Sequence, residues 1–594
     1  MAGTGRAYVR RIARRLPYVG ELRNVVINLE SRLAALEGWP RRPATSNDGA
    51  PSGPRQQTLA MVSAFWNAFD CHIKVDQPPI LIDLFHGIAE YLWRNLVVAK
   101  FVQRITGAPV IGLLGTPGSV HRFAHNVSRS ENMQLASAFG VAHFVAVPDS
   151  DAPESMERSA RAAIAELATQ YPDGTPLPPT AISLLREIRT ESGFPIGQNV
   201  HETFMGAERQ PRVLAGHRLL HWTKRVLGFH AFAEQLVSTM RPSAFVTGQL
   251  DCCPWRNLSE QLIRRGGRVI WTREECRLPI DLLDHIDEST TLNGLMRRIE
   301  RDSFAEFERR INGDANLCKR MDALAQARST AVHNGVGRFW TWAATDKLTS
   351  IPATAFDRAL PSYCLFTHPF TDPPPAVDES LFVDHLEWVE ETCRHAAATR
   401  AYNLIVKVHP RGRSIDLSDT ADRLAAAFAD VRNIYFTHDQ IKPEELAKYC
   451  DLGLTVRGTP GLEMTSLGLP MMLAGRGRYS DMGLCLVPAT RSEYFELLEK
   501  GPQFPIDISE QSRRARLFIA FDRHWSLPMS GLVPSFAERN ASDTSLWILI
   551  AGGFRSACLE TDSAAKALAR AWPKGNAKVI APELEDLFSK TDPG

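Results

Sequence analysis

Between residues 363 and 473, short apolar runs alternate regularly with helical patterns, and this alternation constrains the fold more than any other feature. The apolar runs cover residues 363–367, 403–408, 433–437, 452–456 and 470–473. The helical patterns between them cover residues 383–398, 421–429, 443–450 and 460–467. Strands that alternate with helices predict βαβ units and a parallel sheet. We therefore expect a Rossmann-like domain here.

A similar but less regular alternation precedes it. Apolar runs at residues 80–85, 108–114, 142–147, 244–247 and 268–272 predict strands, and residues 258–265 predict a helix. Residues 150–240 are more helical, which indicates an insertion. With 594 residues, the chain is long enough for three or four domain-sized units. We expect an N-terminal Rossmann-like domain over 58–340, a C-terminal one over 341–505 and a helical tail over 506–594.

The first 57 residues have a different character. Five arginines, at positions 6, 10, 11, 14 and 15, precede a 4-3-4-3 spacing of apolar residues from Leu22 to Leu36. This predicts an amphipathic helix within residues 1–39, with a heptad seam of about two heptads. Such a helix docks on its own domain or forms a homo-oligomer, and the arginines form a solvated tail or rest on anionic lipid. Residues 40–57, rich in proline, glycine and small polar residues, predict a linker.

The composition excludes several classes of protein. A formal charge of +1, from 68 basic and 67 acidic side chains, is far from that of a nucleic-acid binder. Ten cysteines without a CxxC pair favour a reduced, cytoplasmic compartment. No apolar run approaches the roughly 20 residues of a membrane span, and the N-terminus lacks a secretory pattern. We expect a cytoplasmic protein, with the basic N-terminus as a means of peripheral attachment to the membrane.

Histidines, arginines and glycines follow the strands of the C-terminal domain. Lys407, His409 and Arg411 follow the second strand, residues 457–463 follow the fourth, and Tyr479 lies shortly after the fifth. Ligands of open parallel sheets bind at the carboxyl ends of the strands. Arginine offers paired donors to phosphate, so this edge predicts an anion site.

The turn from Arg457 to Glu463 is the most informative segment. We expect Thr459 to cap a helix with Pro460 at its first position, so that the helix N-terminus favours a phosphate. Gly458 and Gly461 permit close approach, and Glu463 can accept hydrogen bonds from ribose hydroxyls. The alternative is an ordinary strand-to-helix turn, in which these residues serve geometry alone.

The run VKVHPRGR, followed by LTVRGTPGLEMTSLGLPMMLAGRGRYSDMGL, resembles the bacterial capsule polysaccharide biosynthesis family. Its members include transferases of Kdo, an acidic sugar delivered from a CMP donor, and share the GT-B architecture of two Rossmann-like domains facing a cleft. The positions that match the family pattern are Lys407, His409, Pro410, Gly461, Glu463, Gly468, Pro470 and Tyr479. The resemblance covers residues 360–485. Met471 stands where the family usually has valine, and Arg457 or Thr459 where it often has serine.

The resemblance implies a metal-independent glycosyltransferase without a cofactor. It would move Kdo or another sugar from a CMP- or UDP-linked donor to a lipid-linked or oligosaccharide acceptor, together with capsule assembly machinery. Lys407, His409 and Arg457 would neutralise the leaving phosphate, which makes His409 catalytic as well as donor-binding. Asp83, His86 and Asp251 are candidates for the general base of the N-terminal domain.

Two alternatives stay open, namely a sugar-nucleotide 2-epimerase on the same fold and a non-catalytic capsule-assembly protein.

Other sequence patterns give weaker evidence for a function. Gly112, Gly115 and Gly118 do not match the dinucleotide fingerprint, and His217 and His221 lack a third metal ligand. No Walker A, HExxH or GxSxG sequence occurs.

Overall fold

The computed structural model describes residues 53–580 with gaps, and residues 1–52 and 581–594 lie outside the described part. The gaps are residues 70–72, 75, 86–88, 116–128, 148–155, 274–277, 287–290, 314, 317, 324–355, 358, 375–378, 410–418, 439–440, 442, 503–505, 523–527 and 534–542. The expected N-terminal helix, His86 and Arg411 therefore lie outside the described residues.

The N-terminal domain is built on a seven-stranded sheet with the strand order β12-β6-β5-β4-β1-β2-β3. Its strands are β1 (Ile80–Leu84), β2 (Val110–Leu114), β3 (His143–Ala146), β4 (Ala244–Thr247), β5 (Arg268–Thr272), β6 (Ile280–Leu283) and β12 (Ala577–Lys578). β3, β2, β1, β4 and β5 run parallel, whereas β6 and β12 are antiparallel to their neighbours. The five strands expected from the sequence are confirmed.

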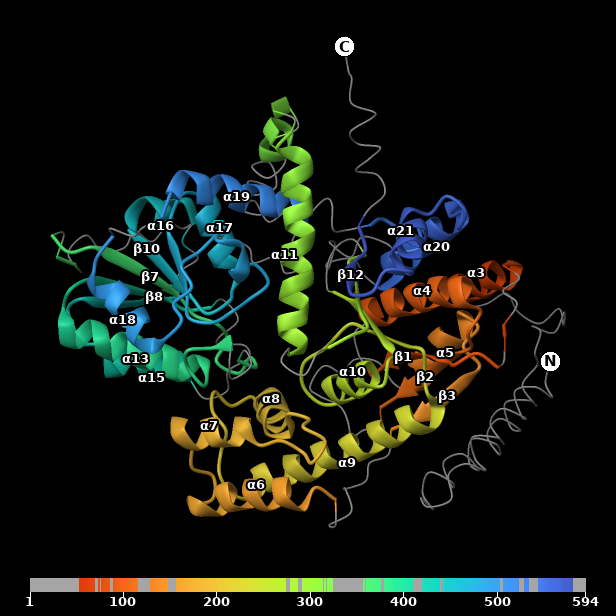
Figure 1. Cartoon of the computed structure of the whole chain (residues 1–594), viewed down its shortest axis with the longest axis horizontal. Helices are drawn as coiled ribbons and strands as arrows, with labels where there is room; N and C mark the ends of the chain where they lie inside the picture. Colours follow the sequence, from red (N-terminus) through yellow and green to blue (C-terminus); the bar gives the residue numbers. More distant parts are fainter. Residues whose placement is uncertain are drawn as a thin grey trace.

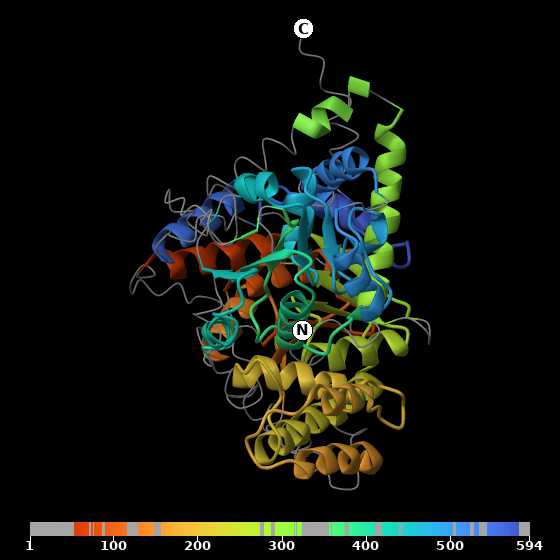
Figure 2. The same cartoon turned by 90° about the vertical axis from the view of Figure 1, so that its left-hand side faces the viewer.

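Helices cover this sheet and form an insertion beside it. They are α3 (Pro54–Ala68), α4 (Ala89–Thr106), α5 (Arg129–Ala138), α6 (Arg158–Gln170), α7 (Pro179–Glu187), α8 (Ile196–Glu208), α9 (His217–Met240) and α10 (Trp255–Arg264). Helices α6 to α9 form the expected helical insertion, which lies at the bottom of both views (Figures 1 and 2). The linker expected over residues 40–57 ends earlier than predicted, because α3 begins at Pro54 and buries Thr58, Val62 and Trp66.

The C-terminal domain has a five-stranded, fully parallel sheet with the order β11-β10-β7-β8-β9. Its strands are β7 (Ser362–Phe366), β8 (Asn403–Lys407), β9 (Ile434–Thr437), β10 (Leu452–Thr455) and β11 (Met471–Leu473). Its helices are α13 (His385–Thr399), α15 (Thr420–Ala427), α16 (Pro443–Tyr449), α17 (Thr459–Ser466), the 3-10 turn η3 (Ser480–Met482) and α18 (Arg491–Glu499). Each element expected here is confirmed to within a few residues.

Successive side chains of the central strand β7 pack into apolar cores on opposite faces of the C-terminal sheet. Tyr363 and Leu365 of β7 join one apolar cluster, while Cys364 and Phe366 join the cluster on the other face. Both faces are therefore buried, as is usual for parallel sheets covered by helices. Continuous apolar runs in the sequence, rather than alternating ones, follow from this burial.

The segment after residue 505 is helical as expected, but it is not a separate tail. Helix α19 (Ile508–Ala520) packs on α17, whereas α20 (Asp543–Ser556) packs on α3 and α21 (Ser563–Ala571) packs on α4. Figure 1 shows α20 and α21 beside α3 and α4. Helix α11 (Leu292–Ile311) lies between the domains and contributes apolar residues to a core of each. The expected α/β fold, with two Rossmann-like domains built on largely parallel sheets, is confirmed.

In the described part of the chain, no helix combines the length and apolar character needed to cross a membrane.

Candidate active site

Three neighbouring strands of the C-terminal sheet end at one edge and place their next residues together. Because β7 lies between β10 and β8, His368 lies between Arg457 and His409. The Nε2 atom of His368 accepts a hydrogen bond of 3.3 Å from the backbone N–H of Arg457. The Oγ1 atom of Thr367 accepts one of 2.8 Å from the backbone N–H of His409. The structure thus brings His409 and Arg457 to one edge, as the sequence predicted, and links both loops through β7.

The turn after β10 differs in one detail from the expectation. Helix α17 begins at Thr459 with Gly458 as its N-cap, so Thr459 is its first residue and not its cap. The N-cap residue has a φ of −72° and a ψ of 158°, and no side chain caps the helix. Pro460 still occupies the first turn, where its missing N–H costs nothing. Thr459 is exposed and Glu463 is half-buried at this helix start.

Tyr479 supports this turn from behind rather than facing outward. Its side chain is buried, and its hydroxyl donates a hydrogen bond to the carbonyl oxygen of Gly458. A Cβ atom at Gly461 would lie 2.1 Å from the same hydroxyl, so only glycine fits there. The expected donor-binding role of Tyr479 therefore becomes an indirect one, exerted through the backbone of the turn.

The edge carries positive charge. The rings of His368 and His385 stack in parallel with centroids 4.5 Å apart. Burial, followed by the positive charges of Arg457 and Arg186, lowers the pKa of His385 to about 3. Burial, His385 and Arg457 lower the pKa of His368 as well. Both imidazoles are therefore neutral near pH 7, and the surrounding cations favour an anion at this edge.

The remaining donor-side residues are placed as follows. The guanidinium of Arg457 donates a hydrogen bond of 3.0 Å to the carbonyl oxygen of Pro373. Lys407 is the last residue of β8 and is half-buried, as is His409. No group of three or more metal-ligating side chains occurs in the part of the chain that the structure describes.

In the N-terminal domain, Asp83 and Asp251 have different surroundings. Asp83 is fully buried, and its carboxylate accepts hydrogen bonds from the backbone N–H of Phe85, the hydroxyl of Thr247 and the indole of Trp255. The structure therefore argues against Asp83 as a general base, because an acceptor hydroxyl has no access to this carboxylate. Asp251 follows β4 and keeps 33% of its side chain exposed.

Residues at the start of α13 form polar contacts with the N-terminal domain. This interdomain contact was not predicted from the sequence. Asp384 caps α13 by accepting a 2.6 Å hydrogen bond from the backbone N–H of Glu387, and it also pairs with Arg212 at 2.9 and 3.2 Å. Arg186 of α7 donates a 2.9 Å hydrogen bond to the carbonyl oxygen of Val383.

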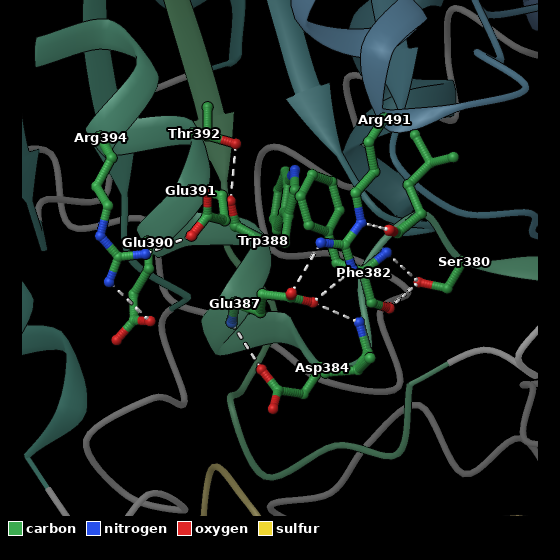
Figure 3. A network of polar contacts seen from close by, with 12 residues as sticks. Ser380, Phe382, Asp384, Glu387, Trp388, Glu390, Glu391, Thr392, Arg394 and Arg491 are labelled. Atoms are coloured by element: carbon green, nitrogen blue, oxygen red, sulfur yellow. Dashed lines mark hydrogen bonds and ion pairs between the residues drawn. The ribbon is translucent and has the colours of Figure 1, made fainter. Parts of the chain in front are cut away.

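Figure 3 shows Asp384 beside Glu387, which in turn binds Arg491 through both carboxylate oxygens. The Asp-x-x-Glu spacing signals a helix start in the sequence. Nothing in the local sequence shows which arginines of the other domain approach it.

Comparisons with known proteins find only distant structural similarities. No family model matches the chain, and no curated protein matches it. Among solved structures, a KpsC β-Kdo 2,4-transferase from Thermosulfurimonas dismutans is 12% identical with a TM-score of 0.28, over 47% of this chain and 79% of that one. The UDP-GlcNAc 2-epimerase from Neisseria meningitidis is 9% identical with a TM-score of 0.22, over 75% and 96%.

The O-GlcNAc transferase from Thermobaculum terrenum is 11% identical with a TM-score of 0.25, over 86% of this chain and 76% of that one. At this distance the similarities assign no function to the chain.

Proposed function

We propose that the chain is a glycosyltransferase that transfers a sugar from a nucleotide-activated donor to a growing bacterial surface polysaccharide. The observation that carries this proposal is the cationic edge where β10, β7 and β8 end. Arg457 and His409 meet there through His368 and Thr367, beside the start of α17. A helix N-terminus next to fixed cations suits a phosphate group.

In this proposal the C-terminal domain holds the donor. Lys407, His409 and Arg457 neutralise the phosphate, and Glu463 accepts hydrogen bonds from the ribose. As the bond between sugar and phosphate breaks, negative charge grows on the leaving nucleotide. Cations and backbone N–H groups that are already in place stabilise this charge more than they stabilise the bound donor, and so lower the barrier.

The resemblance of residues 360–485 to capsule polysaccharide enzymes supports an acidic sugar such as Kdo, delivered from CMP, as the finer form of the proposal. In this form no bound metal or cofactor takes part, because the side chains at the edge supply the positive charge. The basic N-terminal segment would keep the enzyme at the membrane, near a lipid-linked acceptor.

A thermal-shift screen with CMP, UDP, GDP and ADP tests the proposal. A ligand that binds only the folded state stabilises it by about 2.7 kcal/mol at a hundredfold excess over Kd. A shift with CMP alone supports a Kdo-like donor, and a shift with UDP alone redirects the choice of donor. No shift with any nucleotide would remove the basis for a donor site and favour a non-catalytic assembly protein.

The epimerase alternative is separated by incubating the enzyme with the matching sugar nucleotide alone. An epimerase interconverts the sugar and leaves the nucleotide attached. A transferase leaves the sugar unchanged or hydrolyses the donor slowly, which release of free nucleotide detects.

A further inference from the structure

The loop after β4 is held in place from two sides. From β1, Asp83 binds the hydroxyl of Thr247 at 3.0 Å and the indole of Trp255 at 2.7 Å, at the two ends of the loop. From α8, Glu202 accepts a 3.2 Å hydrogen bond from the backbone N–H of Cys252. Asp251 lies between these anchors, at the carboxyl edge of the sheet where ligands of such folds bind.

The backbone next to Asp251 is strained. Cys252 has a φ of 62°, in the left-handed region that residues with a Cβ atom rarely adopt. Among the described non-glycine residues with positive φ, the others are all helix caps. Such strain persists only where the surrounding contacts impose it, and it is concentrated at functional sites.

A single buried guanidinium organises the carboxylates around this loop. Arg256 is 3% exposed and pairs with Glu202 at 2.9 and 3.1 Å and with Glu260 at 3.3 Å. The same guanidinium lies 3.5 Å from Oδ1 of Asp251. Glu202 and Glu260 are buried, so Asp251 is the one carboxylate of this cluster that solvent or a substrate reaches readily.

This cluster is connected to the donor domain by continuous hydrogen bonds. Glu202 accepts a 2.7 Å hydrogen bond from Gln198, and Gln198 accepts one of 2.7 Å from Arg186. Arg186 in turn binds the carbonyl oxygen of Val383, two residues before the His385 that stacks on His368. Three hydrogen bonds, a short piece of backbone and one ring contact therefore link the loop that carries Asp251 to the edge that carries Arg457 and His409.

We propose that Asp251 accepts the proton of the acceptor hydroxyl and that Arg256 is a positioning residue that holds this carboxylate in place. The inference rests on the proposed function. In the step, the acceptor oxygen bonds to the anomeric carbon and its proton passes to Asp251. The bond from that carbon to the donor phosphate breaks, and its electron pair leaves with the nucleotide at the cationic edge.

The test uses the full chain and the sugar nucleotide that matches the nucleotide bound in the screen: CMP-Kdo, UDP-N-acetylglucosamine, GDP-mannose or ADP-glucose. Nucleotide release is measured against pH with water or p-nitrophenyl glycosides as acceptors. Asp251→Asn should lower kcat at least a hundredfold and remove the acid limb of its pH profile. The thermal shift with the nucleotide should stay at the wild-type value, because the donor site is untouched.

Arg256→Lys keeps the charge but loses the paired hydrogen bonds, so kcat should fall about tenfold with the donor KM unchanged. Glu202→Gln should act in the same direction, which covers the case that Arg256→Lys folds poorly. Arg265→Lys is the matched control, since Arg265 is exposed and pairs only loosely with Glu234 at 3.5 Å. It should behave as wild type.

Wild-type kcat in Asp251→Asn would overturn the inference while leaving the proposed function intact. So would equal losses of kcat and nucleotide binding in Arg256→Lys and Glu202→Gln, which indicate a structural role only. A wild-type protein that binds a nucleotide but turns over none of the four donors would overturn the proposed function, and the inference with it.

Discussion

At the scale of single residues, His409 and Arg457 carry the donor hypothesis. Their backbone N–H groups fix the two loops, so removing the side chains leaves those hydrogen bonds in place. A hydrogen bond to a charged group contributes about 1.5–3 kcal/mol, and each 1.36 kcal/mol is tenfold in rate. His409→Ala and Arg457→Ala should each lower donor turnover by about ten- to a hundredfold, measured by nucleotide release.

The control for this experiment is His217→Ala. His217 is exposed at the start of α9, where its ring binds Asp173 at 2.8 Å. Turnover should stay near the wild-type rate. Equal and small effects at all three positions, with unchanged melting temperatures, would refute the placement of the donor at this edge.

A buried histidine predicts how stability depends on pH. The ring of His230 in α9 contacts the ring of Phe194 in a tilted arrangement with centroids 4.6 Å apart, and neither ring nitrogen of His230 has a hydrogen-bond partner among the described residues. Burial lowers the pKa of His230 to about 4. In the unfolded chain this histidine binds a proton near pH 6.5. The free energy of unfolding should therefore fall as the pH is lowered from about 6.5 to 4, by up to about 1.4 kcal/mol per pH unit.

His230→Phe should flatten this part of the stability profile, because phenylalanine keeps the contact with Phe194 and cannot bind a proton. Urea unfolding at several pH values measures the difference. His221→Phe on the exposed side of the same helix is the control and should keep the wild-type slope. An unchanged slope in His230→Phe would show that this histidine takes no part in the acid sensitivity.

At the scale of elements, the turn into α17 depends on a residue distant in sequence. The hydroxyl of Tyr479 donates a hydrogen bond to the carbonyl of Gly458, the residue that caps the helix. Tyr479→Phe removes this donor, while the carbonyl keeps the 3.0 Å hydrogen bond from the backbone N–H of Gly461, so the cost should be about 0.5–1.5 kcal/mol. We expect a lower melting temperature and a higher donor KM with a smaller change in kcat. An unchanged KM would show that the turn does not contact the donor.

The first turn of α13 makes a second prediction at this scale. Asp384 both caps the helix and pairs with Arg212 of the N-terminal domain. Asp384→Asn keeps a capping side chain but loses the charge, whereas Asp384→Ala loses both. Loss of a cap costs about 1 kcal/mol, so the melting temperature should fall in the order wild type, Asn, Ala. Equal melting temperatures for Asn and Ala would show that the cap itself contributes nothing.

At the scale of the whole molecule, strand β12 forms one edge of the N-terminal sheet, although it follows the C-terminal domain in the sequence. Lys578 of β12 is 1% exposed and lies 2.8 Å from both Asp281 and Glu300. Glu300 belongs to α11, the helix between the domains. Arg273, Asp522 and Arg478 extend this cluster, in which three cations balance three carboxylates.

Lys578→Met should therefore be strongly destabilising, because it leaves two buried carboxylates short of a cation. Breaking a buried ion pair costs about 3–5 kcal/mol. The exposed Lys574 is the matched control, and Lys574→Met should leave the melting temperature unchanged. A small effect at Lys578 would show that solvent or Arg273 compensates the two carboxylates.

The sequence alone determined the two parallel-sheet domains, because the alternation of strands and helices and the turn residues between them are local signals. Strands of a parallel sheet that is buried on both faces are continuous apolar runs, which makes these signals easy to read. It also predicted that His409 and Arg457 share an edge, since the order of strands and turns places them there. It did not reveal β6 or β12, the role of α20 and α21 as a cover for the first domain, or the start of α3.

Only the tertiary structure decided which polar residues hold the molecule together and which face a substrate. Asp83 and Asp251 look alike in the sequence, since Asp83 lies near the end of an apolar run and Asp251 lies shortly after one. In the fold, three donors from three separate segments enclose Asp83, whereas Asp251 stays partly exposed beside Arg256. The physical reason is that a carboxylate's exposure and hydrogen-bond partners depend on residues up to 172 positions away, which no local pattern records.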